Sequence, residues 1–222
     1  MKIYFDGCSW TRGADLENKL EERFSRLVSD HFGAEEYNIA AGGGSNDRIV
    51  RNLLVGNNIE EYDLAVIGMT FPARTEYYGD YPQSKKSKGF RWIAVNPKYN
   101  FGHMLFKIKN NTIKEKIVAE HKDGKEIEGL TRYQKFWSEY YRTITTDKFF
   151  QNKEKIQKLT IENHCQVKGV PLVICTINPW TKENFELQMN NKENNPSGKG
   201  HPDAEGHRII ADKIIDIIKS KL

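Results

Sequence analysis

The chain has 222 residues, of which 38% are hydrophobic and 29% are charged, and it carries a net charge of +4. This composition is typical of one soluble globular domain with a sizeable core, and it excludes a disordered chain. The basic residues are scattered along the sequence, whereas a nucleic-acid-binding protein gathers them on one face. We therefore expect no nucleic-acid partner.

Targeting and metal-binding signals are equally sparse. The three cysteines form neither a disulfide framework nor a metal-ligand spacing, so we expect no metal and no cofactor. The chain begins with an apolar run rather than a basic-then-apolar leader, and no apolar run reaches transmembrane length. We therefore expect a cytoplasmic protein that does not bind membranes, and the sequence leaves its oligomeric state open.

The first part of the chain alternates short apolar runs with helical patterns. Apolar residues at helical spacing between Leu16 and Phe32 predict one helix that ends before Gly33. Residues 63–69 form an apolar run that is typical of a strand covered on both faces. The other predictions for this part are strands at residues 2–5 and 36–40, a glycine-rich turn at residues 41–47 and a short helix at residues 49–54.

The middle of the chain has a different composition. Residues 79–130 are polar and rich in lysine, and we interpret them as an insertion at the edge of the sheet that could act as a lid. No repeat and no linker divides the chain, so we expect a single domain over residues 1–222. From the insertion onwards, the patterns predict strands at residues 90–95 and 103–111 that could pair antiparallel, helices at residues 132–144 and 155–169, a strand at residues 171–177 and a terminal helix at residues 203–222.

Chemically active residues follow the predicted strands. In an open parallel sheet, ligands bind beyond the carboxyl ends of the strands. Ser9 follows the first strand, the glycine run Gly42–Gly44 follows the second, and His201 precedes the last helix. A nucleophile, a base and backbone N–H donors are the parts that acyl transfer by a serine needs.

The order and spacing of these segments resemble the SGNH (GDSL-type) hydrolase family. "GCS" at residues 7–9 stands where the family has Gly-Asp-Ser, which makes Ser9 the nucleophile by position. "NIAAGGGSN" resembles the second block, in which the N–H of Gly43 binds the oxyanion together with that of Ser9. "HPDAEGHRIIA" resembles the last block, in which the base is His201 and not His207, which we expect to be structural. The resemblance implies a three-layer α/β/α, flavodoxin-like fold with a central parallel sheet of about five strands.

The sequence departs from the family pattern at several places. Gly198 stands where the family has the aspartate that orients the base, so this acid is missing from its usual place. Thr70 stands where the third block has its asparagine, and a threonine hydroxyl can fill part of that donor role. Asn46 could reach the same oxyanion from another loop, and Arg74 is a further candidate for substrate or oxyanion support. Cys8 replaces the aspartate beside the serine, and we expect it to be a buried small residue.

Each of these residues also has a purely structural interpretation. Ser9 could cap the turn before a helix, and His201 could simply precede a helix start. The glycines Gly42–Gly44 could be there simply to allow a tight turn. Thr70 could end its strand. Arg74 could form a surface ion pair with an acid a few residues further on, Glu76 or Asp80.

The sequence supports three functional hypotheses. The first is an SGNH-like serine esterase that acts on a small ester, such as an O-acetyl group on a sugar. The second is a binding module of the same fold whose site has decayed and which holds a glycan or another small ligand. The first two hypotheses are distinguished by whether the Ser9 oxygen lies within hydrogen-bond distance of a His201 nitrogen. The third is a phosphate- or nucleotide-binding protein that uses "GGGSND" at a helix N-terminus, although the chain lacks a P-loop lysine.

Overall fold

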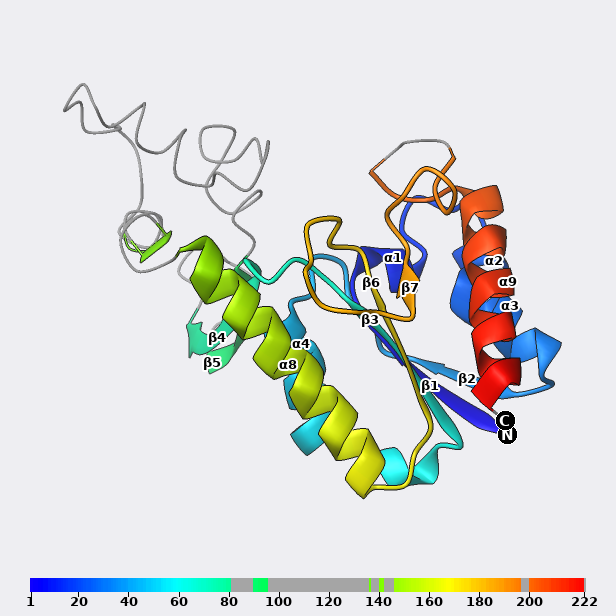
Figure 1. The fold of residues 1–222 in the computed structure, drawn as a ribbon, viewed down its shortest axis with the longest axis horizontal. Coiled ribbons are helices and arrows are strands. Elements are labelled where there is room, and N and C mark those ends of the chain that lie inside the picture. The colour runs from blue at the N-terminus through cyan, green and yellow to red at the C-terminus, as the bar shows by residue number, and fades with distance from the viewer. Residues whose placement is uncertain (81–89, 96–135, 137–139, 142–145, 197–199, 222) are drawn as a thin grey trace.

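The centre of the molecule is a parallel sheet of five strands in the order β2-β1-β3-β6-β7 (Figure 1). Counted along the chain within this sheet, the order is 2-1-3-4-5, which is that of flavodoxin-like folds. The computed structural model describes residues 1–80, 90–95, 136, 140–141, 146–196 and 200–221. The strands of the sheet are β1 (Lys2–Asp6), β2 (Glu35–Asn38), β3 (Leu64–Met69), β6 (Leu172–Thr176) and β7 (Leu187–Gln188).

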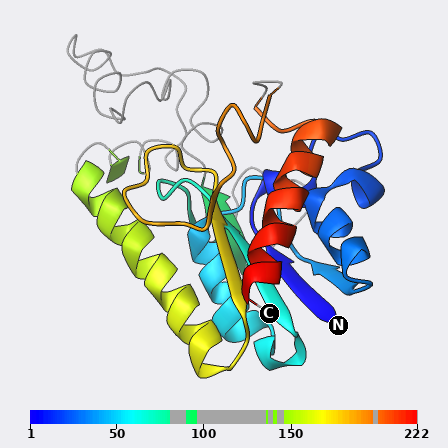
Figure 2. The same cartoon turned by 45° about the vertical axis from the view of Figure 1, so that its right-hand side comes forward.

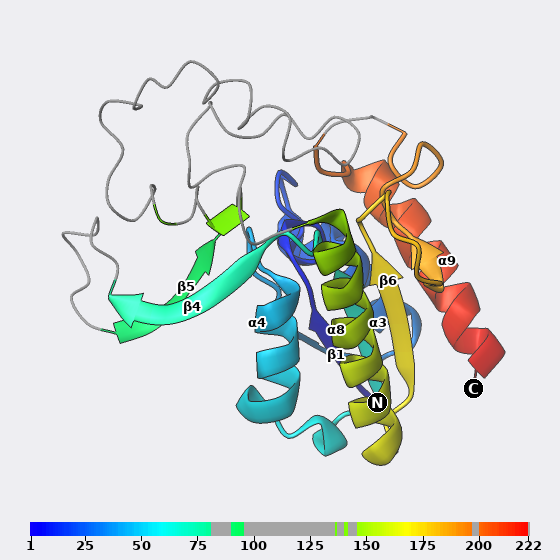
Figure 3. The ribbon, with the colours of Figure 1, turned by 60° about the vertical axis from the view of Figure 1, so that its left-hand side comes forward.

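Helices cover both faces of this sheet (Figures 1 and 3). One face carries α1 (Ser9–Arg12), α2 (Lys19–Glu22), α3 (Phe24–His31) and α9 (Ala204–Lys221). The other face carries α4 (Asn46–Arg51), the π-helical turn η1 (Asn52–Gly56) and α8 (Asp147–Val167), and the 3-10 turn η2 (Ile59–Glu61) leads into β3. The expected three-layer α/β/α fold with a central parallel sheet is confirmed. None of the helices that the structure describes is long and apolar enough to cross a membrane.

The apolar strands are explained by this two-sided cover. Successive side chains of a strand point to opposite faces of the sheet. Ile3 and Phe5 pack in the core beneath α3 and α9, whereas Tyr4 packs in the core beneath α4 and α8, and all three are fully buried. Every residue of β3 is likewise buried. β1 lies between β2 and β3, with Lys2 opposite Glu35 and Ile3 opposite Leu64, so its carboxyl end lies between the carboxyl ends of these two strands.

The prediction of one helix between Leu16 and Phe32 is wrong, because the segment is divided into α2 and α3. Arg23 separates the two helices with an extended backbone, φ −68° and ψ 142°. Its guanidinium donates to both carboxylate oxygens of Glu36, from Nε at 2.9 Å and from Nη2 at 2.7 Å. This paired contact with β2 outweighs the local preference for a continuous helix. As a result Leu20, which the pattern places on the buried face, is 60% exposed.

The strands outside the main core were only partly predictable. The strand expected at residues 90–95 is β5 (Phe90–Val95), and its antiparallel partner is β4 (Thr75–Asp80). β7 has two residues and no apolar run, so no pattern in the sequence predicts this strand. The strand expected at residues 103–111, and most of the insertion and of the helix expected at residues 132–144, lie outside the described residues.

His207 joins the terminal helix α9 to α3. Its ring is fully buried and stacks on that of Phe24 with centroids 5.7 Å apart. Its Nδ1 accepts a hydrogen bond from the Phe24 N–H at 3.1 Å, so the neutral ring carries its proton on Nε2. Burial lowers the pKa of His207 to about 4, because the charged imidazolium would lose its hydration. His207 therefore has a structural role, as the sequence analysis expects.

We expect His207 to make stability depend on pH in the acidic range. An unfolded histidine takes up its proton near pH 6.5 and the folded one only near pH 4, so the stability present above pH 6.5 is lost as the pH falls towards 4. The full difference corresponds to roughly 3 kcal/mol. In denaturant titrations at about pH 7 and about pH 4.5, the gap in unfolding free energy between wild type and His207→Gln should narrow at the lower pH.

The matched control is His31→Gln, because His31 is an exposed histidine at the end of α3. This variant should follow the wild-type curve at both pH values. A gap between wild type and His207→Gln that is equally wide at both pH values would contradict the prediction.

Candidate active site

Ser9 lies at the carboxyl end of β1, where the chain turns into α1. Gly7 and Cys8 form the turn, and Ser9 is the first residue of the helix and 9% exposed. The segment that leads into α9 crosses the same end of the sheet (Figure 2). It brings His201 Nε2 to 2.9 Å from Ser9 Oγ. Two residues that the sequence predicts as nucleophile and base, 192 positions apart, are therefore within hydrogen-bond reach.

A carboxylate lies on the other side of the His201 ring. Oδ2 of Asp15 is 2.6 Å from Nδ1 of His201. A carboxylate only accepts hydrogen bonds, so it fixes the ring proton on Nδ1 and leaves Nε2 to accept the hydroxyl proton of Ser9. The contacts run from Ser9 through the His201 ring to Asp15, an arrangement that suits acyl transfer by a serine. The Asp15 side chain is 76% exposed and that of His201 is 26% exposed, so water reaches the acid more freely than the base.

Sequence reasoning missed Asp15. It looks for the acid three residues before the base, at Gly198, which lies outside the described residues. Asp15 comes instead from the loop after α1, and its φ of 69° is in the left-handed region that few residues other than glycine adopt. Gly13, which ends α1, is also left-handed, with φ 77°. A Gly-x-Asp pattern directly after the nucleophile's helix is the signal that the sequence does contain.

Trp10, next to Ser9, holds the loop that carries His201. Its indole Nε1 donates to the carbonyl oxygen of Gly200 at 3.1 Å, and the residue is only 4% exposed. On the other side of His201, Asp203 Oδ1 accepts a hydrogen bond from the Gly206 N–H at 3.0 Å at the start of α9. The position of His201 is therefore fixed by a hydrogen bond to the residue before it and by the start of α9 after it.

The glycine loop is fastened to the nucleophile turn. The N–H of Ala41 donates to the Gly7 carbonyl oxygen at 3.2 Å, and that of Gly44 donates to the Ala41 carbonyl oxygen at 3.0 Å. A Cβ atom at Gly44 would lie 3.1 Å from the Gly7 oxygen, so the two backbones touch. Gly43 has φ 70°, which favours glycine. Among the described residues, neither the Gly43 N–H nor the Ser9 N–H donates to a partner.

The remaining predicted site residues meet after β3. Asn46 is fully buried and pairs with the backbone of Thr70: its Nδ2 donates to the Thr70 oxygen at 2.9 Å, and its Oδ1 accepts from the Thr70 N–H at 2.7 Å. Thr70 Oγ1 accepts a hydrogen bond from Arg74 Nη1 at 2.8 Å. The same Nη1 lies 3.4 Å from the Gly44 carbonyl oxygen. The surface pair considered for Arg74 is not formed with Glu76, whose carboxylate binds Arg51 at 2.7 Å.

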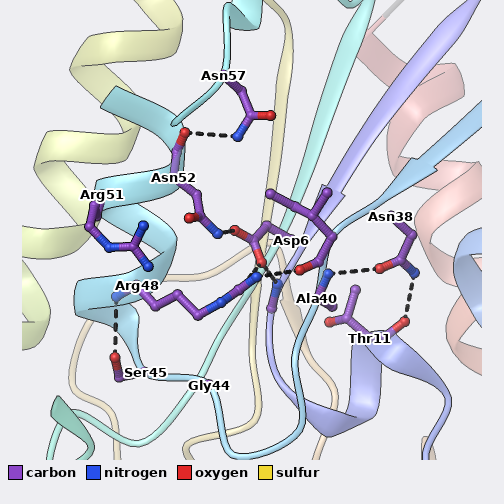
Figure 4. A network of polar contacts seen from close by, with 12 residues as sticks. Asp6, Thr11, Asn38, Ala40, Gly44, Ser45, Arg48, Arg51, Asn52 and Asn57 are labelled. Atoms are coloured by element: carbon purple, nitrogen blue, oxygen red, sulfur yellow. Dashed lines mark hydrogen bonds and ion pairs between the residues drawn. The ribbon is translucent and has the colours of Figure 1, made fainter. Parts of the chain in front are cut away.

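Behind the nucleophile turn, a buried network surrounds the carboxylate of Asp6 (Figure 4). Its Oδ1 accepts from the Gly7 N–H and from Arg48 Nη1, both at 2.7 Å, and its Oδ2 accepts from Asn52 Nδ2 at 2.9 Å. Arg48 Nη2 also donates to the carbonyl oxygen of Ile39, just before the glycine loop. Burial raises the pKa of Asp6, and the positive charge of Arg48 opposes this rise.

Other features of the site have structural partners. Ser45 Oγ caps α4 by accepting a hydrogen bond from the Arg48 N–H at 3.2 Å, so the helix end considered for phosphate binding already has a side-chain cap. Cys8 is fully buried, as expected. Within the described ranges, no three His, Cys, Asp or Glu side chains gather as they would around a metal ion.

The fold is similar to those of solved esterases. The psychrotrophic esterase EstA from Pseudoalteromonas sp., inhibited by monoethylphosphonate, is 11% identical with a TM-score of 0.50, over 99% of this chain and 97% of that one. A protein assigned to the G-D-S-L lipolytic family from Desulfitobacterium hafniense is 10% identical with a TM-score of 0.40, over 97% and 98% of the two chains. A two-domain esterase active on acetylated mannans is 14% identical with a TM-score of 0.40, over 99% of this chain and 49% of that one. No family model matches the chain, and a search of curated proteins found no relative. At these identities the likeness establishes the fold alone.

We expect the turn before Ser9 to tolerate no side chain at Gly7. A Cβ atom there would lie 2.2 Å from Thr11 Oγ1 and 2.9 Å from the backbone oxygen of Gly68, which cannot rotate away. Gly7→Ala should therefore lower the free energy of unfolding by about 2 kcal/mol in denaturant titrations. Gly56→Ala is the control, because the nearest neighbour of its Cβ would be at 3.7 Å, and it should change stability by less than about 1 kcal/mol. Equal losses in the two variants would refute this account of the turn.

Proposed function

We propose that the protein is a serine esterase of the SGNH (GDSL) type that hydrolyses a small ester, such as an O-acetyl group on a carbohydrate, through an acyl-enzyme. The observation that carries the proposal is the pair of contacts from Ser9 Oγ through the His201 ring to Asp15, at 2.9 and 2.6 Å. The likeness to esterases supports it at the level of the fold. The choice of an acetylated carbohydrate follows the family resemblance.

In the proposed reaction, His201 transfers one proton during acylation of Ser9 and one during hydrolysis of the acyl-enzyme. Its Nε2 takes the hydroxyl proton as Ser9 Oγ attacks the ester carbonyl carbon, and it gives the proton to the departing alcohol oxygen as the ester bond breaks. Water then attacks the acyl-enzyme with His201 again as base, which releases the acid and restores Ser9. Asp15 holds the Nδ1 proton and stabilises the imidazolium in both stages. No step needs a metal or a cofactor.

The oxyanion that forms on the carbonyl needs hydrogen-bond donors. We assign this role to the N–H groups of Ser9 and Gly43, which have no other acceptor in the described part of the chain. Thr70 Oγ1 adds a third donor, because it accepts from Arg74 and so keeps its own hydrogen for the oxyanion. Asn46 fixes the Thr70 backbone and has one amide hydrogen left for the same purpose.

The alternative is a binding module that retains the fold and has lost the reaction. The exposure of Asp15 favours this alternative, because an exposed carboxylate is screened by water and orients its base weakly. The 2.9 Å contact between Ser9 and His201 favours the esterase, because a ligand-binding site has no need of a nucleophile paired with its base.

An activated serine should react with a fluorophosphonate. We expect wild-type protein to gain the mass of one adduct, because Nε2 of His201 takes the proton of the attacking Ser9 hydroxyl. Ser9→Ala and His201→Ala should both remove the adduct, as read by intact-protein mass spectrometry. Unlabelled wild-type protein, with both variants folded like wild type by circular dichroism, would favour the binding module.

Asp15→Asn should lower kcat by about 10-fold to 100-fold with little change in KM, since the side chain orients the base and does not bind substrate. The loss is smaller than for a buried acid because Asp15 is exposed. Asp15→Glu should restore part of kcat.

Proton NMR tests the same contact without turnover: a downfield signal from the His201 Nδ1 proton should be present in wild type and absent in Asp15→Asn. Glu17→Gln, which alters an exposed acid on the same loop, should keep both the signal and kcat. Unchanged kcat and signal in Asp15→Asn would remove Asp15 from the mechanism.

A further inference from the structure

Two arginines lie against the glycine loop that flanks the nucleophile. Nη1 of Arg12 is 3.7 Å from the point that a Cβ atom at Gly42 would occupy. Nη1 of Arg74 is 3.4 Å from the carbonyl oxygen of Gly44. Gly43, the proposed oxyanion donor, therefore has a guanidinium group next to each of its two chain neighbours.

Both arginines also lie next to residues that would surround a substrate. Arg12 follows Ser9 by three positions in α1, so the two side chains lie on the same side of one helical turn, and Arg12 is exposed. Arg74 binds the Thr70 hydroxyl and stacks over the Phe71 ring, 5.2 Å from its centroid. These contacts hold the plane of the Arg74 guanidinium in place beside the loop.

The charges of these two arginines are not balanced by carboxylates among the described residues. The acids nearest to them in the chain are engaged elsewhere: Asp15 binds His201, and Glu76 binds Arg51. Asp47, at the start of α4, accepts hydrogen bonds from three other side chains, which are Thr75, Lys153 and Gln157. By contrast, four other arginines are each paired with a carboxylate, in the pairs Arg23–Glu36, Arg26–Asp30, Arg48–Asp6 and Arg51–Glu76. Arg208, exposed on α9, also has no carboxylate partner among the described residues.

We propose, on the basis of the esterase function proposed above, that Arg12 and Arg74 form a subsite for a negatively charged group of the substrate, so that the preferred esters carry a carboxylate or a similar oxyanion close to the ester bond. Guanidinium groups suit this role because their planar donors match the oxygens of carboxylates and related anions. The subsite lies beside the glycine loop, so the charged group would be bound within reach of the ester that Ser9 attacks.

The test compares a charged and a neutral ester of the same shape. Wild type and Arg12→Gln are assayed with 3-acetoxybenzoate and with its methyl ester, each rate being corrected for spontaneous hydrolysis. We expect the ratio of kcat/KM for the charged ester to that for the neutral one to fall by about threefold to fivefold in Arg12→Gln. In wild type the same ratio should fall as salt is added, because the attraction is screened. Arg26→Gln is the matched control, because Arg26 is a partly exposed arginine on α3, away from the loop, and it should keep the wild-type ratio.

The outcomes separate this proposal from the one on which it rests. If wild type hydrolyses both esters and Arg12→Gln lowers both rates equally, or leaves the ratio unchanged, the anion subsite is wrong and the esterase stands. If wild type hydrolyses neither ester and gains no fluorophosphonate adduct, the esterase itself fails. Ser9→Ala serves as an internal check, because it should abolish the hydrolysis of both esters.

Discussion

The buried carboxylate of Asp6 is the constraint on which the end of the sheet that carries Ser9 depends. It sits at the last residue of β1 and is fully buried, so its charge has to be balanced inside the protein. Arg48 supplies the opposite charge, and the Gly7 N–H and Asn52 Nδ2 supply further hydrogen bonds. Removing one partner of such a buried pair typically costs about 3–5 kcal/mol, because it leaves the other charge uncompensated. The network therefore fixes the direction in which the chain leaves β1 towards Ser9.

The same network joins three segments that are separate in the sequence. Arg48 reaches from α4 to Asp6 on β1 and to the Ile39 carbonyl ahead of the glycine loop. Asn52 follows Arg48 by four positions at the end of α4, so the two side chains lie on the same face of the helix and reach Asp6 together. Through the bond from Arg48 to Ile39, this face of α4 also holds the start of the glycine loop next to the turn before Ser9.

Elements that follow from a local apolar pattern were predictable, whereas features fixed by one polar contact between distant residues were not, except where the family resemblance pointed to them. The strands β1, β3 and β6 and the helix α9 follow from apolar runs and helical spacing, because burial on the sheet demands them. Ser9 and His201 were predicted from their positions at the ends of these elements together with the resemblance of their segments to SGNH family blocks. The break at Arg23 could not be predicted, since it depends on the pairing of Arg23 with Glu36 on β2. Asp15 could not be predicted either, because its role depends on a left-handed backbone and on a histidine 186 positions away.

Two carboxylates within ten residues thus have opposite environments and opposite uses. Asp6 is buried, fully bonded and part of the framework, whereas Asp15 is exposed and bonded to the ring of His201. Because Ser9 and Asp15 both belong to the short segment after β1, the distant C-terminal segment contributes only His201 to the proposed triad, and Trp10 holds that segment through the Gly200 carbonyl. Asp15 comes from the segment that carries Ser9 and not from the segment before His201, and it meets the His201 ring at Nδ1 while Ser9 meets it at Nε2. A glycine at position 198 is therefore compatible with the set of three residues proposed here.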